Sequence, residues 1–217
     1  MKIKSAVLVC VPMLLAGTVF AQEEKWDASA DYSYLRFNPS LTGIQTRSFN
    51  GGGGAIQWNI FKLIGIKADL QGYGSTSWTV TYDDPIVTKK GIVPAGTYRT
   101  NGNQFTWMFG PVVRVPTSHF TLFTEVLFGG SNTNAYGTLF KNIDAAGGSI
   151  IGFSGTQHPF TMAAGGGVDL NISKAVAIRL GEVDYVLTRY TNPLLNTNNQ
   201  NNFRYVGGVT FKLGGPQ

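Results

Sequence analysis

Few side chains of this 217-residue chain could take part in covalent catalysis, because it holds two histidines and one cysteine. His158 lies beside Pro159, and Ser154 comes four residues before it. A histidine, a serine and a carboxylate can form an acyl-transfer site, but they need a spatial arrangement that no spacing here guarantees. His119 lies in a short polar turn. We therefore interpret both histidines as loop residues and expect no catalytic residue.

The potential metal and phosphate ligands also form no recognisable motif. Cys, His and carboxylate residues show no metal-site spacing. The glycine runs Gly51–Gly54 and Gly165–Gly167 lack the following lysine and helix that a phosphate-binding loop requires. We expect neither a metal nor a cofactor.

Three charged residues, Lys67, Glu125 and Arg179, lie within alternating apolar stretches, each a similar distance beyond a short polar segment. An ionised group that is removed from water needs a partner of opposite charge. The sequence therefore predicts a buried ion-pair cluster in which Lys67 and Arg179 surround Glu125. This cluster requires elements that bring the three side chains to the same depth.

Those elements are predicted as β-strands, because the side chains alternate with a period of two residues. Residues 109 to 130, for example, hold two alternating runs on either side of the turn Pro116–His119. A tilted strand needs about nine to eleven residues to cross a bilayer, and most of these runs have that length. No segment predicts an amphipathic helix. The expected strands are Trp26–Phe37, Asn50–Asn59, Ile64–Gly74, Asn103–Val115, Phe120–Gly130, Phe160–Leu170, Ala175–Tyr190 and Phe203–Leu213.

The connections between these strands alternate in length. The short ones are 60–63, 116–119 and 171–174, and the long ones are 38–49, 75–102, 131–159 and 191–202. An even number of antiparallel strands with this segregation is typical of outer-membrane barrels. The sequence therefore predicts an all-β fold, an eight-stranded antiparallel up-and-down transmembrane β-barrel with short periplasmic turns and long extracellular loops.

The two faces of the expected strands differ in polarity. One face is apolar, as at Ile64, Ile66 and Leu70, and the other carries sparse charges among Gly, Ser and Thr. The outer face of a soluble barrel would be rich in Lys and Glu, whereas a crowded interior needs small polar residues. We expect the apolar face to meet lipid. A soluble secreted barrel that holds an apolar ligand is a weaker alternative.

The interior of an eight-stranded barrel is just wide enough for side chains. This favours a lumen plugged by the ion pairs of Lys67, Glu125 and Arg179. A charged gate in a narrow passive pore is the alternative interpretation of the same three residues.

The N-terminus resembles an export signal. Lys2 and Lys4 precede the apolar run Ala6–Phe20, and Val19 and Ala21 form a small-residue cleavage site. We predict a signal peptide at residues 1–21 and one barrel domain at 22–217. The only cysteine, Cys10, falls in the signal, so no disulfide is expected. The formal net charge of +5 is spread along the chain, which excludes a nucleic-acid surface.

The stretches "GPVVRV…FTLFTEVLFGG", "AAGGGVDLNISKAVAIRLGEVDYVLTRY" and "NNFRYVGGVTFKL" resemble the OmpA-like or opacity-type outer-membrane barrel domain. The resemblance implies integral insertion into the outer membrane after export, contact with its lipids, and assembly by the barrel-assembly machinery. The chain departs from the family pattern because "GGPQ" follows the last strand. The peptidoglycan-binding domain of OmpA is missing, so the resemblance implies no attachment to the cell wall.

The expected function is non-enzymatic display of surface loops for envelope structure, adhesion or ligand binding. In the second long loop, "WTVTY" and "AGTYR" are expected to extend the barrel wall as a hairpin. Their aromatic residues Trp78, Tyr82 and Tyr98 form a possible contact surface for an unknown surface ligand. Alternatively, these residues pack against one another and stiffen the loop. A lipid A-modifying enzyme with His158 at the outer rim is the alternative function.

Overall fold

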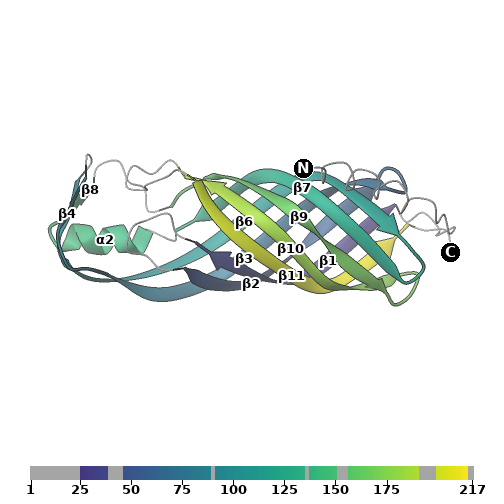
Figure 1. The fold of residues 1–217 in the computed structure, drawn as a ribbon, viewed down its shortest axis with the longest axis horizontal. Helices are drawn as coiled ribbons and strands as arrows, with labels where there is room; N and C mark the ends of the chain where they lie inside the picture. The colour runs from purple at the N-terminus through teal and green to yellow at the C-terminus, as the bar shows by residue number, and fades with distance from the viewer. Residues whose placement is uncertain are drawn as a thin grey trace, which may run out of the picture.

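Eight long strands close into an antiparallel barrel in the computed structural model, which describes residues 25–38, 46–88, 91–134, 137–150, 156–190 and 199–214 (Figure 1). Each strand pairs with its neighbours in sequence, and the first pairs with the last. The barrel strands are β1 (Trp26–Phe37), β2 (Arg47–Asn59), β3 (Ile64–Tyr82), β6 (Gly96–Pro116), β7 (Phe120–Thr133), β9 (Phe160–Asn171), β10 (Val176–Arg189) and β11 (Asn199–Leu213). The predicted fold class is confirmed. The predicted signal peptide, residues 1–21, lies outside the described residues.

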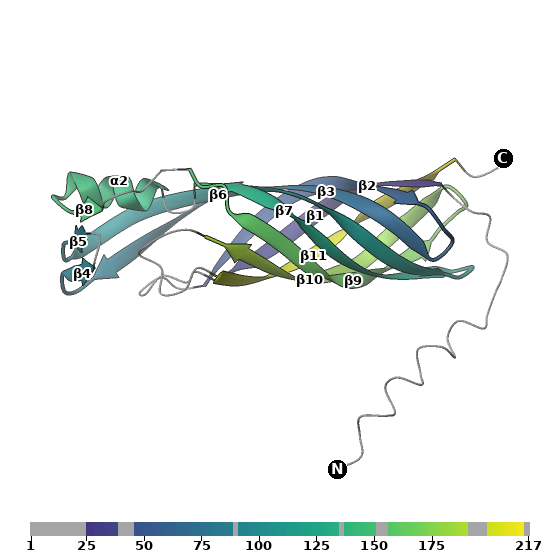
Figure 2. The same ribbon diagram turned by 90° about the horizontal axis from the view of Figure 1, so that it is seen from above.

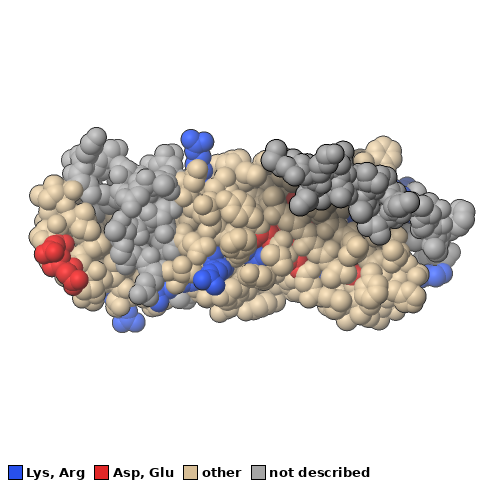
Figure 3. Space-filling model, in the orientation of Figure 1, with Lys and Arg blue, Asp and Glu red and all other residues tan. Residues whose placement is uncertain are grey.

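The distribution of polarity is the reverse of that in a soluble protein. Large apolar side chains point out of the wall, and Tyr32, Ile56 and Phe109 are each more than half exposed. Ionised side chains point inward, and Lys67 and Glu125 are at most 2% exposed. Exposed apolar surface on this scale is stable only in contact with lipid. On the face shown in Figure 3, the described barrel surface is mostly uncharged.

Aromatic residues mark both edges of the lipid-facing band. Trp26 and Trp58 stack at one end of the barrel with ring centroids 6.0 Å apart. Towards the other end, the rings of Tyr34 and Tyr205 also lie with centroids 6.0 Å apart. The Tyr34 hydroxyl forms a hydrogen bond of 2.6 Å with Ser48 Oγ. From Trp26 to Tyr34, a tilted strand rises about 20 Å, close to the band height of membrane barrels.

Tight turns connect the strands at one end, which we call the short-turn end. The turn between β2 and β3 is closed by backbone hydrogen bonds between Phe61 and Ile64. In the turn between β6 and β7, Thr117 N–H donates to the carbonyl of Phe120. The described chain also begins and ends here (Figures 1 and 2). We call the opposite end the long-loop end.

The long-loop end carries a folded extension, which we call the cap. It consists of residues 76–82 of β3 and 96–102 of β6, the small sheet β4 (Ile86–Thr88), β5 (Gly91–Val93) and β8 (Ser149–Ile150), and helix α2 (Gly137–Ala145). Figure 2 shows it projecting beyond the barrel. The register from Thr76 opposite Gly102 to Tyr82 opposite Gly96 confirms the predicted hairpin extension.

The sequence predicted no helix, but the structure contains helix α2. It spans nine residues and buries Leu139, Phe140 and Ile143 against the other parts of the cap. Gly147 follows it with φ of +83°, a conformation that glycine adopts freely at helix ends. Nine residues make only about two and a half helical turns, too few for a clear period in the sequence. In the described part of the chain, no helix is long and apolar enough to cross a membrane.

Candidate functional site

The centre of the lumen holds a network of ion pairs. Lys67 Nζ lies 2.9 Å from Glu125 Oε2 and 3.2 Å from Glu182 Oε2. The side chains of Lys67 and both glutamates are at most 2% exposed. β3, β7 and β10 supply these three residues, so the contacts cross the barrel interior.

Arg204 of β11 forms the second node of this network. Its guanidinium approaches Asp69 at 2.7 Å, Asp184 at 2.7 Å and Glu182 at 3.1 Å. Glu125 lies at 3.9 Å, at the limit of an ion pair. Because a single buried cation meets four carboxylates, Arg204 joins strands on opposite sides of the lumen.

Arg179 forms the third node, nearer the short-turn end. It pairs with Asp169 at 3.0 Å and Glu182 at 2.8 Å, and its guanidinium carbon lies 4.6 Å from the centre of the Phe123 ring. The sequence-based hypothesis that Lys67 and Arg179 surround Glu125 therefore needs correction. Lys67 contacts Glu125, but the second cation near this carboxylate is Arg204. We define the luminal ion network as Lys67, Asp69, Glu125, Asp169, Arg179, Glu182, Asp184 and Arg204.

Glu182 and Asp184 were missed from the sequence because strict alternation from Arg179 would point both towards lipid. The register of β10 shifts between Arg179 and Glu182 in the pairing with β11, and between Arg179 and Gly181 in the pairing with β9, so Leu180 and Gly181 form a β-bulge. The extra residue moves Glu182 and Asp184 to the luminal face. In the sequence, an isolated glycine followed by two acidic residues in a mostly apolar strand could have indicated this bulge.

Inward-facing glycines make room for these side chains. A Cβ atom on Gly165 would lie 2.2 Å from Asp184 Oδ1, and one on Gly208 would lie 2.5 Å from Asp31 Oδ1. Gly53 lies similarly close to the Gln71 carboxamide. These glycines are therefore a packing requirement of the luminal side chains beside them, of which Asp184 belongs to the luminal ion network.

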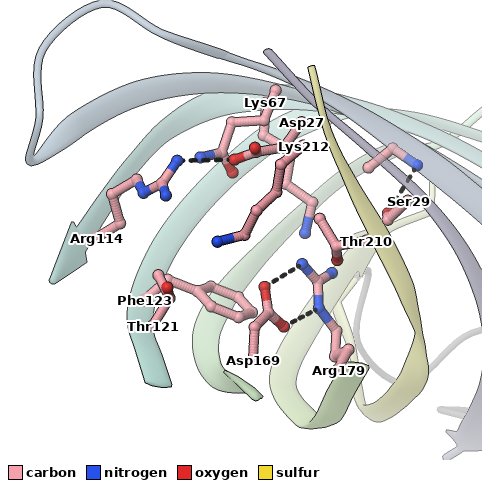
Figure 4. A pocket seen from close by; sticks show the side chains of 12 residues that line it. Asp27, Ser29, Lys67, Arg114, Thr121, Phe123, Asp169, Arg179, Thr210 and Lys212 are labelled. Carbon is pink, nitrogen blue, oxygen red and sulfur yellow. Dashed lines mark hydrogen bonds and ion pairs between the residues drawn. The ribbon is translucent and has the colours of Figure 1, made fainter. Parts of the chain in front are cut away.

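Between the network and the short-turn end of the barrel lies a small cavity (Figure 4). Arg114 pairs with Asp27 at 2.7 Å across it, and Arg179 and Asp169 line its inner side. The cavity volume of about 20 Å³ suffices for about one water molecule.

Between the network and the long-loop end, buried polar side chains such as Gln71, Thr188 and Asn202 share the lumen with apolar side chains, and the apolar side chains continue into the cap. Leu35, Phe37 and Phe49 are at most 1% exposed. The rings of Phe37 and Phe49 meet edge to face at 5.0 Å, and Phe49 contacts Trp78 at 6.0 Å. A single apolar cluster therefore runs from the barrel mouth into the cap.

Trp78, Tyr82 and Tyr98 belong to this cluster, and each is at most 8% exposed. Tyr82 and Tyr98 lie with ring centroids 6.1 Å apart. Burial raises the pKa of the Tyr82 hydroxyl, and Tyr98 adds to the shift. The exposed contact surface proposed for these three residues is therefore corrected in favour of the alternative, in which they pack together.

A larger cavity of about 420 Å³, which we call the rim cavity, lies where β3, β6 and β7 enter the long-loop end. Its lining includes exposed Asn103, Phe105 and Asn132, and buried Gln104. The complete described lining is Gly72, Tyr73, Asn103, Gln104, Phe105, Asn132, Thr133, Asn134 and Thr156.

The histidines do not gather into a catalytic arrangement in the described part of the chain. His119 is exposed in a short turn, where its Nδ1 lies 2.9 Å from Ser118 Oγ. His158 is exposed at the long-loop end, and Ser154 lies outside the described residues. Carboxylate oxygens of Glu125, Glu182 and Asp184 lie within 4.8 Å of one another, as a metal site requires, but Lys67 and Arg204 already supply positive charge there.

Known structures with a similar fold are outer-membrane barrels. Neisserial surface protein A (NspA) aligns at a TM-score of 0.55 with 10% identity, covering 87% of this chain and 97% of its own. OprG from Pseudomonas aeruginosa aligns at 0.52 with 14% identity, covering 88% and 97%. No family model matches the chain, and no curated protein matches its sequence. These similarities show the fold, whereas the OmpA-like or opacity-type family stays a prediction.

Proposed function

We propose that this protein is a non-enzymatic integral outer-membrane barrel with a plugged lumen, which presents a rigid cap at the cell surface. The observation that carries the proposal is the filling of the barrel by buried side chains at its centre and at its long-loop end. The luminal ion network occupies its centre, and the apolar cluster of Leu35, Phe37 and Phe49 occupies its long-loop end.

Filling of this kind opposes the alternative of a passive pore. Ions cross a membrane through hydrated sites that bind them weakly. Here the buried charges already neutralise one another at distances of 2.7 to 3.2 Å, and apolar rings follow them along the axis. Opening a path would expose several unpaired charges at once, which is costly.

The orientation and the partners belong to the same proposal. An even number of strands places both ends of the barrel chain on one side, and in the outer membrane this is the periplasmic side. The cap then faces outward. Outer-membrane lipids would contact the apolar band, the barrel-assembly machinery would insert the exported chain, and the cap would contact a surface ligand for envelope structure or adhesion.

Conductance of the refolded protein in planar bilayers tests the plug. We expect no steady conductance from protein that shows heat-modifiable migration, which reports a closed barrel. Arg204→Ala should introduce transient openings, because Asp69 and Asp184 lose their shared partner. Arg99→Ala is the matched control, since Arg99 is exposed in the cap. Steady conductance of the unaltered protein would contradict the plug.

Cysteine labelling on intact cells tests the orientation separately. The only cysteine lies in the predicted signal peptide, so single cysteines can be introduced without background. A membrane-impermeant maleimide should label Thr79→Cys in the cap and leave Ser118→Cys at the short-turn end unlabelled. Both positions are exposed. The opposite labelling pattern would reject the proposed orientation.

A further inference from the structure

Two arginines on the outer wall of the barrel lie apart from the luminal ion network. Arg36 of β1 and Arg189 of β10 are exposed, and both strand neighbours of each are buried. Strand alternation therefore directs the two side chains away from the lumen, on the same face of the wall as the apolar band. We propose that Arg36 and Arg189 bind the phosphate groups of a phosphorylated glycolipid in the outer leaflet of the membrane.

The described barrel wall outside the cap carries outward charge of one sign. Arg36 and Arg189 are its exposed basic residues, and neither forms an ion pair with a described carboxylate. Residues 39–45 and 191–198, which follow β1 and β10 in the chain, contain no Asp or Glu. An anion that pairs with these arginines is therefore expected from outside the chain. The acidic residues of the eight strands are all buried in the lumen, and they are Asp27, Asp31, Asp69, Glu125, Asp169, Glu182 and Asp184.

Both arginines lie at the edge of the lipid-facing band. Arg36 is two residues beyond Tyr34, about 7 Å further along β1, and Arg189 is the last residue of β10, beyond Tyr185. Tyrosine rings favour the membrane interface, where the lipid phosphates lie. An outward arginine is costly at the bilayer midplane but nearly neutral at this level. This inference rests on the proposed function, because only a cap that faces outward places this edge of the band in the outer leaflet.

The two arginines flank β11, which lies between β1 and β10. The register of β11 against both neighbours puts the Cα atoms of Arg36 and Arg189 roughly 16 Å apart. Between them, Asn201 Oδ1 accepts a hydrogen bond of 2.7 Å from the Tyr185 hydroxyl, which holds this carboxamide on the outer face. Guanidinium groups match the geometry of phosphate oxygens. A headgroup with a phosphate at each end of a disaccharide can therefore span both arginines, whereas a lipid with one phosphate engages only one.

Native mass spectrometry of protein refolded from denaturant tests the inference, because refolded protein carries no lipid from cells. The detergent is uncharged, and only protein with heat-modifiable migration is used. The probes are lipid A with both phosphates, the same lipid without phosphates, phosphatidylglycerol and inorganic phosphate. We expect bisphosphorylated lipid A to bind at least tenfold more tightly than the phosphate-free lipid and than phosphatidylglycerol.

Variants locate the site. Arg36→Gln and Arg189→Gln should each weaken lipid A binding about fivefold, and the double variant by more than tenfold. Arg36→Lys should retain more affinity than Arg36→Gln, because lysine keeps the charge. The matched control Arg99→Gln should leave the affinity unchanged, since Arg99 is exposed in the cap. The unfolding midpoint should be the same in all variants, which separates lost lipid binding from lost stability.

The inference is overturned if lipid A binds equally with and without its phosphates, if the double variant binds like the unaltered protein, or if phosphatidylglycerol binds as tightly as lipid A. Binding of inorganic phosphate without binding of lipid A would also contradict a lipid site. Conductance and cysteine labelling of the same protein report on the plug and the orientation. A failure of lipid A binding with those results intact would therefore leave the proposed function standing.

Discussion

At the scale of single residues, the lumen is stabilised by reciprocal pairing. Arg204 contacts Asp69, Asp184 and Glu182, and it is 1% exposed. A buried ion pair adds little net stability over an apolar pair, but loss of one partner leaves the other charge unpaired. The residues of the luminal ion network therefore depend on one another.

Arg204→Met should lower the free energy of unfolding by about 3–5 kcal/mol, because Asp69 and Asp184 lose their cationic partner and Glu182 keeps only Lys67 and Arg179. Denaturant titration of the refolded barrel measures the change. The control Arg99→Met should change it by less than about 0.5 kcal/mol, as expected for an exposed site. In the double variant with Asp69→Asn, the loss should be smaller than the sum of the single losses. Equal stability of Arg204→Met and the original protein would contradict the pairing.

At the scale of elements, one inserted residue decides which side chains of β10 face the lumen. Leu180 and Gly181 form the bulge, and Glu182 and Asp184 beyond it point inward. A Cβ on Gly181 would meet no atom within 4 Å. A small side chain would therefore fit at position 181. The bulge requires a residue at this position, but it does not require that the residue be glycine.

Deletion of Gly181 should reduce folding sharply, whereas Gly181→Ala should be tolerated. Without the bulge, Glu182 and Asp184 face lipid, and Lys67, Arg179 and Arg204 each lose at least one carboxylate partner. This costs at least about 3 kcal/mol. The folded fraction is read from heat-modifiable migration after refolding into vesicles. Normal folding of the deletion variant would show that β10 reaches its register by another route.

The exposed apolar band makes a second prediction for the strands. Arginine at Leu70, which is 52% exposed on the lipid face of β3, should cost about 2–4 kcal/mol near the bilayer midplane. The matched control is Val87→Arg, because Val87 is 75% exposed but lies in the cap. Refolding equilibria in lipid vesicles compare them. Equal tolerance at both sites would undo the placement of the band in the bilayer.

At the scale of the whole molecule, the protein has two cores of opposite character. The barrel interior is ionic and its exterior apolar, whereas the cap has an apolar core of the kind found in soluble proteins. β3 and β6 pass through both, so the barrel anchors the cap. In Figure 3, the largest acidic area on the visible face lies at the tip of the cap, away from the barrel.

Trp78→Ala should loosen the cap and leave the barrel closed. Removal of a large buried aromatic side chain costs about 3–5 kcal/mol locally. Hydrogen exchange should accelerate in α2 and in residues 96–102, while heat-modifiable migration stays unchanged. Thr79→Ala, at the exposed neighbouring position, should have no effect on either measurement. Unfolding of the barrel together with the cap would show that the two cores form one cooperative unit.

Local patterns in the sequence were sufficient to predict the barrel and its polarity. Two-residue alternation is a local property of strands, and alternating loop lengths constrain their order, so the eight strands and the inward side of Lys67 and Glu125 could be predicted. The partners of these charges could not, because they come from strands far apart in the chain.

The filling of the lumen and of the cap could not be predicted, because it depends on contacts between segments far apart in the chain. The bulge at Gly181 shifts one strand by a residue, which reverses the faces of Glu182 and Asp184 and gives Arg179 different partners. Burial of Trp78, Tyr82 and Tyr98 likewise depends on α2 and the small sheet closing over the hairpin. Alternation gives the side of a strand on which a residue lies, but packing between distant segments decides what covers that side.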